Sequence, residues 1–250
     1  MWKISAVDKD WLVLREIRCY NRVMDLNTYL DAITNKCFDK FGQFQRLLTE
    51  HNKICNLTSV TDERDVLYKH FLDSVAGEFL FDKGAEIVEI GSGGGFPSIP
   101  LKLLRNDLRF TLIESTGKKC AYLQSVVDKM GLDGVKVVNM RAEEGAHSEI
   151  YREKYPFACA RAVARLNTLV EYCLPFVEVG GLFVAYKGDA AEEIKEAQTA
   201  VCVLGGEIEK VIRYDLPENY GARTLVCIRK VKRTPPAYPR GRGLERKKPL

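Results

Sequence analysis

Four glycines in five positions follow a short apolar run, and this feature most constrains what the chain can fold into. Ile87 and Val88 lead into the segment Glu89-Ile90-Gly91-Ser92-Gly93-Gly94-Gly95-Phe96-Pro97, and Glu114 ends the next apolar run. Glycine adopts positive φ at little cost and lets a ligand approach the backbone closely. In doubly wound α/β folds, a strand that enters such a turn and an acidic residue that ends the next strand hold the ribose of an adenosyl cofactor. The pattern therefore predicts an α/β fold with an adenosyl ligand.

The residues after the glycines narrow the choice of ligand. Nicotinamide and flavin sites place a third glycine where Phe96 stands, and Pro97 is a poor start for a helix that must face a pyrophosphate. No Gly-Lys-Ser/Thr follows, which excludes a P-loop. S-adenosylmethionine carries no phosphate, so the loop suits that cofactor. A purely structural glycine turn remains an alternative.

Apolar and helical segments alternate from residue 84 onward, which is typical of a mostly parallel sheet with helices on both faces. The expected strands are 87–90, 110–113, 135–138, 157–160, 182–186, 208–212 and 225–228, and the expected helices are 97–105, 118–130, 166–177 and 190–204. No convincing helix separates the last two strands, so we expect an antiparallel hairpin at the sheet edge. Seven strands with this ending predict a class I, Rossmann-like methyltransferase sheet.

Three regions are expected along the chain. Residues 1–82 form an N-terminal helical region, in which the apolar residues between Leu26 and Leu48 recur every three or four positions and Thr61 is the expected N-cap of a helix toward Phe81. Residues 83–230 form the methyltransferase domain. Residues 231–250 form a basic tail whose prolines and glycines favour an extended or disordered state in isolation.

Charge is unevenly distributed. The chain of 250 residues has a net charge of +4, yet residues 229–250 contain nine basic residues and one acid, which leaves the remainder at −4. A basic tail on a mildly acidic body suggests either a polyanionic partner, such as RNA, or a solvated tail that aids solubility. We expect the tail to add salt-dependent affinity for RNA.

Composition excludes several other classes. The eight cysteines form no C-x-x-C pair and the three histidines are scattered, so no metal site is expected. No apolar run is long enough to cross a membrane, and the first ten residues lack the apolar core of a signal peptide. The sequence thus predicts a cytoplasmic protein without a membrane partner.

The expected fourth strand ends at Arg161, where chemistry in open α/β sheets is placed. The chain lacks the Asn/Asp-Pro-Pro-aromatic motif of amino-methylating enzymes, and Cys159 lies inside the strand rather than where a cytosine-C5 nucleophile would stand. Arg161 and Arg165 are suited to guanine or to anionic surfaces, because arginine binds guanine O6 and N7 in a bidentate manner. For Arg165, an ion pair at the rim is an equal alternative. Glu143 is placed to read adenine, but on residue type alone its better interpretation is an acid that stabilises the first turn of a helix.

Taken together, the motifs resemble the RsmG (GidB) family of bacterial 16S ribosomal RNA guanine-N7 methyltransferases, from about Asn52 to the C-terminus. The matching segments are Asn56-Leu57-Thr58, His70-Phe71-Leu72-Asp73-Ser74, the glycine loop, Ser115-Thr116-Gly117-Lys118-Lys119, Ala160-Arg161-Ala162-Val163-Ala164, Tyr186-Lys187-Gly188 and Tyr238-Pro239-Arg240. Two positions depart from the family pattern: His51-Asn52 stands where the family often has tryptophan, and Ser98 where it often has glycine.

The resemblance implies S-adenosylmethionine as the cofactor. The implied target is N7 of guanine 527 in the 530 loop of 16S rRNA, and the partner is this RNA or the small ribosomal subunit. The implied cofactor residues are Gly91, Phe96, Glu114, Ser115, Thr116, Ala142, Glu143 and Arg161. Candidate RNA contacts are Arg165, Lys187, Arg223 and Arg240. N7 carries no proton, so no general base is expected, no catalytic residue is assigned, and His70 and Asp73 are expected to have structural roles. A monomer is expected. The alternatives are a class I methyltransferase with another RNA or a small-molecule substrate, and a non-catalytic ribosome-binding protein.

Overall fold

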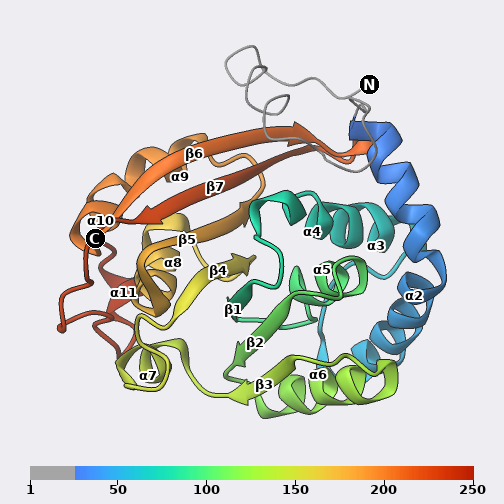
Figure 1. Cartoon of the computed structure of the whole chain (residues 1–250), viewed down its shortest axis with the longest axis horizontal. Helices are drawn as coiled ribbons and strands as arrows, with labels where there is room; N and C mark the ends of the chain where they lie inside the picture. Colours follow the sequence, from blue (N-terminus) through green and yellow to red (C-terminus); the bar gives the residue numbers. More distant parts are fainter. Residues whose placement is uncertain (1–25) are drawn as a thin grey trace.

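A seven-stranded sheet forms the centre of the computed structural model, which describes residues 26–250, and helices cover both of its faces (Figure 1). The strands are β1 (Glu86–Ile90), β2 (Arg109–Glu114), β3 (Val135–Asn139), β4 (Tyr155–Arg161), β5 (Val177–Lys187), β6 (Gly206–Asp215) and β7 (Ala222–Lys230). Their order is β3-β2-β1-β4-β5-β7-β6, and β7 runs antiparallel to both of its neighbours. The predicted class I sheet and its edge hairpin are confirmed.

The strand order places the site. From β1 the chain moves outward through β2 to β3, and then returns to place β4 on the other side of β1. The direction of winding therefore reverses between β1 and β4. Ligands of open α/β sheets bind outside the carboxyl ends of the strands at such a reversal.

Apolar side chains alternate between the two faces of the strands. In β1, Ile87 belongs to one buried cluster and Val88 to the other, and Phe183 and Val184 of β5 divide in the same way. Successive side chains of a strand point to opposite faces, so a sheet covered on both sides needs apolar residues at nearly every position. The continuous apolar runs in the sequence reflect this double burial.

Helices connect the parallel strands as expected. They are α5 (Ser98–Leu104), α6 (Gly117–Met130), α7 (Ala142–His147), α8 (Leu166–Cys173), α9 (Ala191–Glu196) and α10 (Gln198–Val203), with short 3-10 turns at Leu174–Phe176 and Pro217–Asn219. The expected helices 166–177 and 190–204 are thus each shorter or divided in the structure. None of the helices described within residues 26–250 has the length and apolar content to cross a membrane.

The N-terminal helices pack on the face that α5 and α6 cover. They comprise α2 (Leu26–Cys55), α3 (Glu63–Val66), a π-helical stretch (Leu67–Leu72), α4 (Asp73–Val75) and a 3-10 turn (Glu78–Leu80). The predicted apolar stripe is buried at Ile33, Cys37, Phe41, Phe44 and Leu48, whereas the side chains of Leu26 and Leu30, like residues 1–25 of the predicted N-terminal region, lie outside the described part.

The helix after residue 60 begins one position later than expected. Asp62, not Thr61, is the N-cap, because its carboxylate accepts a hydrogen bond from the Asp65 N–H at 3.0 Å. Aspartate and threonine are both good N-caps, so the sequence pattern did not distinguish them.

The C-terminal segment, residues 231–250, is packed rather than extended. It folds back over α7 and α8 and ends in the short helix α11 (Leu244–Lys247) (Figure 1). Arg152 donates hydrogen bonds to the carbonyls of Thr234 and Tyr238, each at 2.9 Å. The expected extended or disordered state concerns the segment in isolation, whereas in the folded chain the domain itself supplies partners for its backbone.

Candidate active site

The glycine loop follows β1 directly, and two of its glycines are required by geometry. Gly91 has φ of 72°, and a Cβ there would lie 2.6 Å from Cγ2 of Val163. Gly95 has φ of 89°, and a Cβ there would lie 2.7 Å from Cγ1 of Ile99. A side chain at either position would need both an unfavourable φ and movement of a neighbour. The loop therefore approaches the segment after β4 more closely than any other residue type allows.

Glu114 at the end of β2 joins this loop to the next strand. Its carboxylate accepts hydrogen bonds from the Gly93 N–H at 3.0 Å and from the Thr116 N–H at 2.7 Å, and the residue is only 6% exposed. A carboxylate has about four lone-pair positions, so two remain for a ligand. Glu114 thus holds the glycine loop in place, and its remaining lone pairs are able to accept hydrogen bonds from the hydroxyl groups of a ligand.

A cavity of about 400 Å³, here called the first cavity, opens at the carboxyl ends of β1, β2 and β3. Four of the predicted cofactor residues line it: Gly91, Ser115, Ala142 and Glu143. The remaining lining residues are Ile90, Ile113, Met140, Arg141, Val163, Tyr172, Gly243 and Arg246. The lining thus combines apolar side chains with polar and charged groups that can fix the orientation of a small molecule.

Glu143 lies at a position that is compatible with both of its expected roles. It lies in the first turn of α7, where a negative charge is favourable, and it also lines the first cavity. The neighbouring Tyr172 was missed by sequence reasoning, because it lies inside an ordinary amphipathic helix, α8.

The predicted cofactor residues Phe96 and Arg161 lie on the other side of the loop. Phe96 is 6% exposed and packs against Phe44 and His70 from the N-terminal helices, with ring centroids 5.4 and 4.6 Å away. The Arg161 guanidinium lies 4.9 Å from the centre of the Phe96 ring. Neither side chain is among the residues that line the first cavity.

A second cavity, of about 490 Å³, lies next to the first, beyond Ala162 and Val163. It is lined by Val60, Lys69, His70, Asp73, Arg161, Ala162, Tyr186, Lys187, Gly188, Asp189, Glu193 and Arg223. Arg161 and Ala162 line the second cavity and Val163 the first, so three consecutive residues at the end of β4 lie between the two spaces. Seven charged side chains of both signs line the second cavity, whereas three line the first.

Asp73 is the central anion of the second cavity. Its Oδ2 lies 2.9 Å from Nη1 of Arg161, its Oδ1 accepts a hydrogen bond from the Tyr214 hydroxyl at 2.7 Å, and Nε of Arg223 lies 3.6 Å from Oδ1. The carboxylate is buried and satisfied by these groups. The structural role that the sequence predicted for Asp73 is present, and the residue in addition positions two arginines.

His70 is neutral in this environment. Nδ1 of His70 lies 3.1 Å from Nη2 of Arg161 and 3.1 Å from the Lys69 carbonyl oxygen, and Nε2 lies 2.8 Å from the Thr58 hydroxyl. Burial and then the charge of Arg161 lower the pKa of His70 to about 3. The imidazole therefore stays unprotonated at neutral pH and positions Arg161.

Each candidate RNA contact has a carboxylate neighbour. Arg165 pairs with Glu196 at 2.5 Å on the surface, as its alternative interpretation expected, and Arg223 lies beside Asp73. Lys187 pairs with Glu193 at 2.7 Å, and Arg240 pairs with the buried Glu171 at 2.7 Å. Exposed pairs of this kind are weak and exchange readily, whereas the pairs of Lys187 and Arg240 are largely buried.

Two other chemistries find no support among residues 26–250. Burial raises the pKa of the Cys159 thiol well above its usual range, so it is not a thiolate nucleophile. No group of three or more His, Cys, Asp and Glu side chains in the described part of the chain could hold a metal ion.

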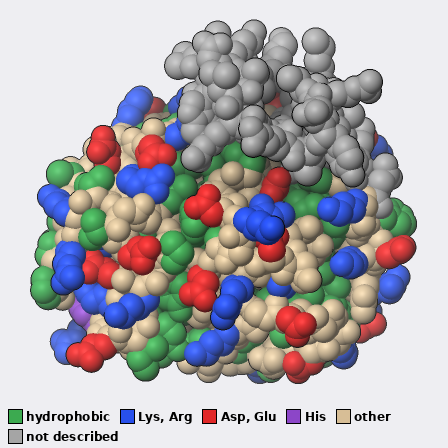
Figure 2. Space-filling view, viewed as in Figure 1, with side chains coloured by type: hydrophobic (Ala, Val, Ile, Leu, Met, Phe, Trp, Pro, Cys, Tyr) green, Lys and Arg blue, Asp and Glu red, His purple; other side chains and the backbone are tan. Residues whose placement is uncertain are grey.

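On the face seen in Figure 2, basic and acidic side chains are interspersed.

Comparison with known proteins identifies the family. The family model described as rRNA small subunit methyltransferase G matches residues 38–219. The chain belongs to this family. The resemblance that the motifs indicated is thereby confirmed.

Relatives in the rRNA small subunit methyltransferase G family match over most of their length. The chain is 45% identical over 222 residues to the protein of this name from Brevibacillus brevis, covering 88% of this chain and 93% of the relative. It is 41% identical over 233 residues to that from Lactobacillus acidophilus, covering 91% and 97%.

Solved structures agree with the fold. A SAM-dependent methyltransferase from Aquifex aeolicus is similar, with a TM-score of 0.51 and 15% identity over 72% of this chain and 97% of that one. M. jannaschii TYW2, solved in complex with AdoMet, has a TM-score of 0.53 and 10% identity over 69% of this chain and 80% of that one. At these identities the likeness shows the fold alone, which is that of class I methyltransferases.

Proposed function

We propose that the protein is an S-adenosylmethionine-dependent methyltransferase that methylates N7 of a guanine, family position 527, in the 530 loop of 16S rRNA. The observation that carries this proposal is the pair of adjoining cavities at the reversal point of the sheet. One suits an adenosyl cofactor and the other a polar, partly anionic substrate. The family, whose members carry the name of an rRNA small subunit methyltransferase, supplies the class of substrate.

The residues of the first cavity fit the cofactor. The Gly91 backbone borders the cavity without a side chain, and a Cβ there would enter the space beside Val163. The turn presents no phosphate cradle, because α5 begins only at Ser98, after the bulky Phe96 and Pro97. We propose that Glu114, Ser115 and Thr116 hold the ribose and that Ala142 and Glu143 contact the adenine. When bound, the cofactor supplies a methyl group on a sulfonium.

The second cavity is the proposed place of the target base. Its described lining includes four cations that can donate to guanine O6 or to phosphate oxygens: Lys69, Arg161, Lys187 and Arg223. Asp73 holds two of these cations, Arg161 and Arg223, in position, and they compensate its charge. Methylation at N7 makes the ring cationic, and the Asp73 carboxylate offsets part of the repulsion between this ring and the arginines.

No general base is required for the proposed reaction. N7 carries a lone pair and no proton, and His70, the imidazole of the second cavity, is a neutral group that positions Arg161. The described residues therefore act by holding N7 in line with the methyl group. Correct proximity and orientation can lower a barrier by roughly 7–11 kcal/mol.

The remaining expectations are part of the same proposal. Arg165, Lys187, Arg223 and Arg240 are the proposed RNA contacts, with exposed Arg165 the most readily exchanged from its carboxylate. The protein is proposed to act as a cytoplasmic monomer on 16S rRNA or on the small ribosomal subunit.

The test uses labelled S-adenosylmethionine and small ribosomal subunits from cells that lack the enzyme, with modified nucleotides mapped by mass spectrometry. We expect label on N7 of one guanine in the 530 loop. Label in another RNA or in metabolites would support a different class I substrate. Cofactor binding without label in any fraction would support a non-catalytic ribosome-binding protein.

A glycine variant adds a direct test of the first cavity. Gly91→Ala should abolish labelling and weaken cofactor binding at least tenfold, because the new Cβ would meet Val163 at 2.6 Å. Gly84→Ala is the matched control: Gly84 also has positive φ, 73°, but a Cβ there meets nothing within 4 Å. If both variants bound the cofactor as tightly as the unchanged protein, the first cavity would not be the cofactor site.

A further inference from the structure

The C-terminal segment (residues 231–250) is anchored to the domain at its beginning. The Thr234 hydroxyl donates to the Leu204 carbonyl at 2.7 Å, and Lys230 donates to that hydroxyl at 2.6 Å. The Thr234 N–H donates to Glu153 at 2.8 Å. Thr234 is 3% exposed, so these bonds are shielded from water. The segment therefore leaves β7 in a defined direction.

A buried ion pair anchors the middle of the segment. Glu171, on α8, is completely buried, and its carboxylate accepts hydrogen bonds from the Arg240 N–H at 2.8 Å, from Nε at 3.0 Å and from Nη2 at 2.7 Å. Arg240 Nη1 also donates to the Lys248 carbonyl at 2.9 Å. Removing one partner would leave a buried charge uncompensated, which is strongly unfavourable. The pair thus holds residues 240–248 against α8.

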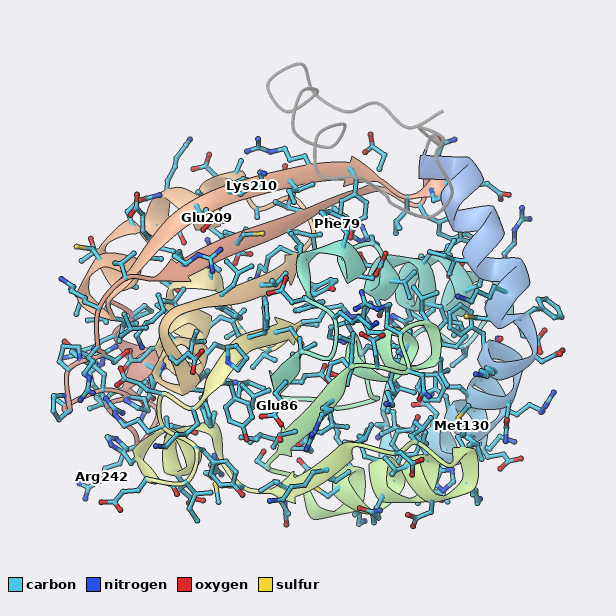
Figure 3. The ribbon with its side chains drawn as sticks, in the orientation of Figure 1. Phe79, Glu86, Met130, Glu209, Lys210 and Arg242 are labelled. Carbon is cyan, nitrogen blue, oxygen red and sulfur yellow. The ribbon has the colours of Figure 1, made fainter. Side chains whose placement is uncertain are left out.

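The end of the segment is anchored to the same helix. The Thr168 hydroxyl on α8 donates to the Glu245 carbonyl at 2.8 Å, and the Gly241 N–H donates to the Glu245 side chain. Glu245 is buried, whereas Arg242, labelled at the outer edge of the segment in Figure 3, is exposed. One turn of α8 therefore fixes the segment through Thr168 and Glu171.

The anchored segment reaches the first cavity. Gly243 and Arg246 line this cavity together with Tyr172, which follows Glu171 on α8. The pKa of Tyr172 is raised, first by burial, while a hydrogen bond with Arg246 lowers it and the charges of Glu143 and Glu245 raise it further. Arg246 thus lies beside Tyr172 and Glu143, at the end of the cavity proposed for the adenine.

We propose that the C-terminal segment is a wall of the cofactor site, with Arg246 as a cofactor-binding residue and Arg240 as a positioning residue that acts through Glu171. This inference rests on the proposed S-adenosylmethionine site. Arg246 can cover the adenine face or donate to its ring nitrogens, because a guanidinium is planar and only donates. The composition of this segment suggested an RNA-binding arm. The proposal instead makes the segment necessary for cofactor affinity, even in the absence of RNA.

The experiment measures the dissociation constant of S-adenosylmethionine by calorimetry on the full chain, without RNA, at two salt concentrations. Arg246→Ala should weaken cofactor binding about five- to tenfold. Because Arg246 is exposed, we expect the variant to fold as the unchanged protein does. Lys247→Ala is the matched control, since this exposed neighbour does not line the cavity, and it should bind as the unchanged protein does.

A second pair of variants tests the anchor. Arg240→Ala should weaken cofactor binding at least fivefold, and Arg240→Lys should recover only part of it, because lysine keeps the charge but cannot reproduce the fork. Hydrogen exchange of residues 240–248 should be faster in Arg240→Ala and slower in the cofactor complex of the unchanged protein.

The outcomes separate this inference from the proposed function. If the unchanged protein failed to bind the cofactor, the proposed function itself would be overturned. If the unchanged protein bound the cofactor, and Arg246→Ala and folded Arg240→Lys bound it equally well, only the role of the C-terminal segment would be refuted. A loss seen solely in binding to ribosomal subunits would also refute it, in favour of an RNA-binding arm.

Discussion

Glu89, one position before the end of β1, is a buried carboxyl group whose protonation should control how stability depends on pH. It is completely buried, and neither of its oxygens makes a hydrogen bond of ordinary geometry among the described residues. Burial raises its pKa from 4.5 to about 8, while the nearby Ser98 hydroxyl and the Arg161 charge act in the opposite direction. Glu89 is therefore protonated in the folded protein at neutral pH and ionised in the unfolded chain.

The sign and size of the effect follow from this difference. Between pH 4.5 and about 8 the folded state holds a proton that the unfolded state has lost, so the free energy of unfolding falls as pH rises. Each pH unit in this window changes it by about 1.36 kcal/mol, which amounts to about 3 kcal/mol between pH 4.5 and 7. Glu89→Gln keeps the shape of the neutral acid and removes the proton equilibrium.

The assay is guanidinium unfolding of the unchanged protein and of Glu89→Gln at intervals from pH 5 to 8. We expect the two to be close at pH 5 and the glutamine variant to gain about 3 kcal/mol relative to the unchanged protein by pH 7.5. Glu86→Gln is the control, because Glu86 starts the same strand, is exposed and pairs with Arg109 at 3.4 Å (Figure 3). A difference between Glu89→Gln and the unchanged protein that stays flat across this range would refute the assignment of a neutral, buried Glu89.

Two further predictions concern packing and thiol chemistry. Phe44→Ala should lower the free energy of unfolding by about 3–5 kcal/mol, since Phe44 is fully buried against Phe71 and Phe96. Phe38→Ala is the control on the same helix: Phe38 is 68% exposed, so its loss should change this free energy little. Equal losses in the two variants would contradict the described packing. Cys159 should resist modification by a thiol reagent at pH 8 in the folded protein. Cys202 is exposed, so Cys202→Ser should remove a fast phase of this modification. Rapid modification of Cys159, observed by mass spectrometry, would count against its burial.

The sheet was predictable from the sequence because local pattern decides it. Largely apolar runs, such as those within β1 and β5, are typical of strands that are buried on both faces, and the glycine loop marks the end of the first strand. The hairpin of β6 and β7 followed from the missing helix between them. These features depend on neighbouring residues, which a single sequence displays.

The C-terminal segment was not predictable in the same way. Its composition suggested an extended arm, but its state depends on the pairing of Arg240 with Glu171, 69 residues earlier, and on Thr168 and Glu245, 77 residues apart. A count of charges does not show which charges are neutralised by buried partners. The partners of Asp73 were not predictable for the same reason, since Arg161 and Arg223 come from the ends of distant strands.

Each cavity is completed by an extension at one end of the chain. The central sheet supplies Gly91, Ser115 and Ala142 to the first cavity and Arg161 to the second. The N-terminal helices add Lys69, His70 and Asp73 to the second cavity alone, and the C-terminal segment adds Gly243 and Arg246 to the first alone. Since the sheet is the part shared with structures of many specificities, the N-terminal helices are the part of the chain where selection of the base would be encoded. The C-terminal segment would then govern affinity for the cofactor, so the two ligands would be controlled by opposite ends of the sequence.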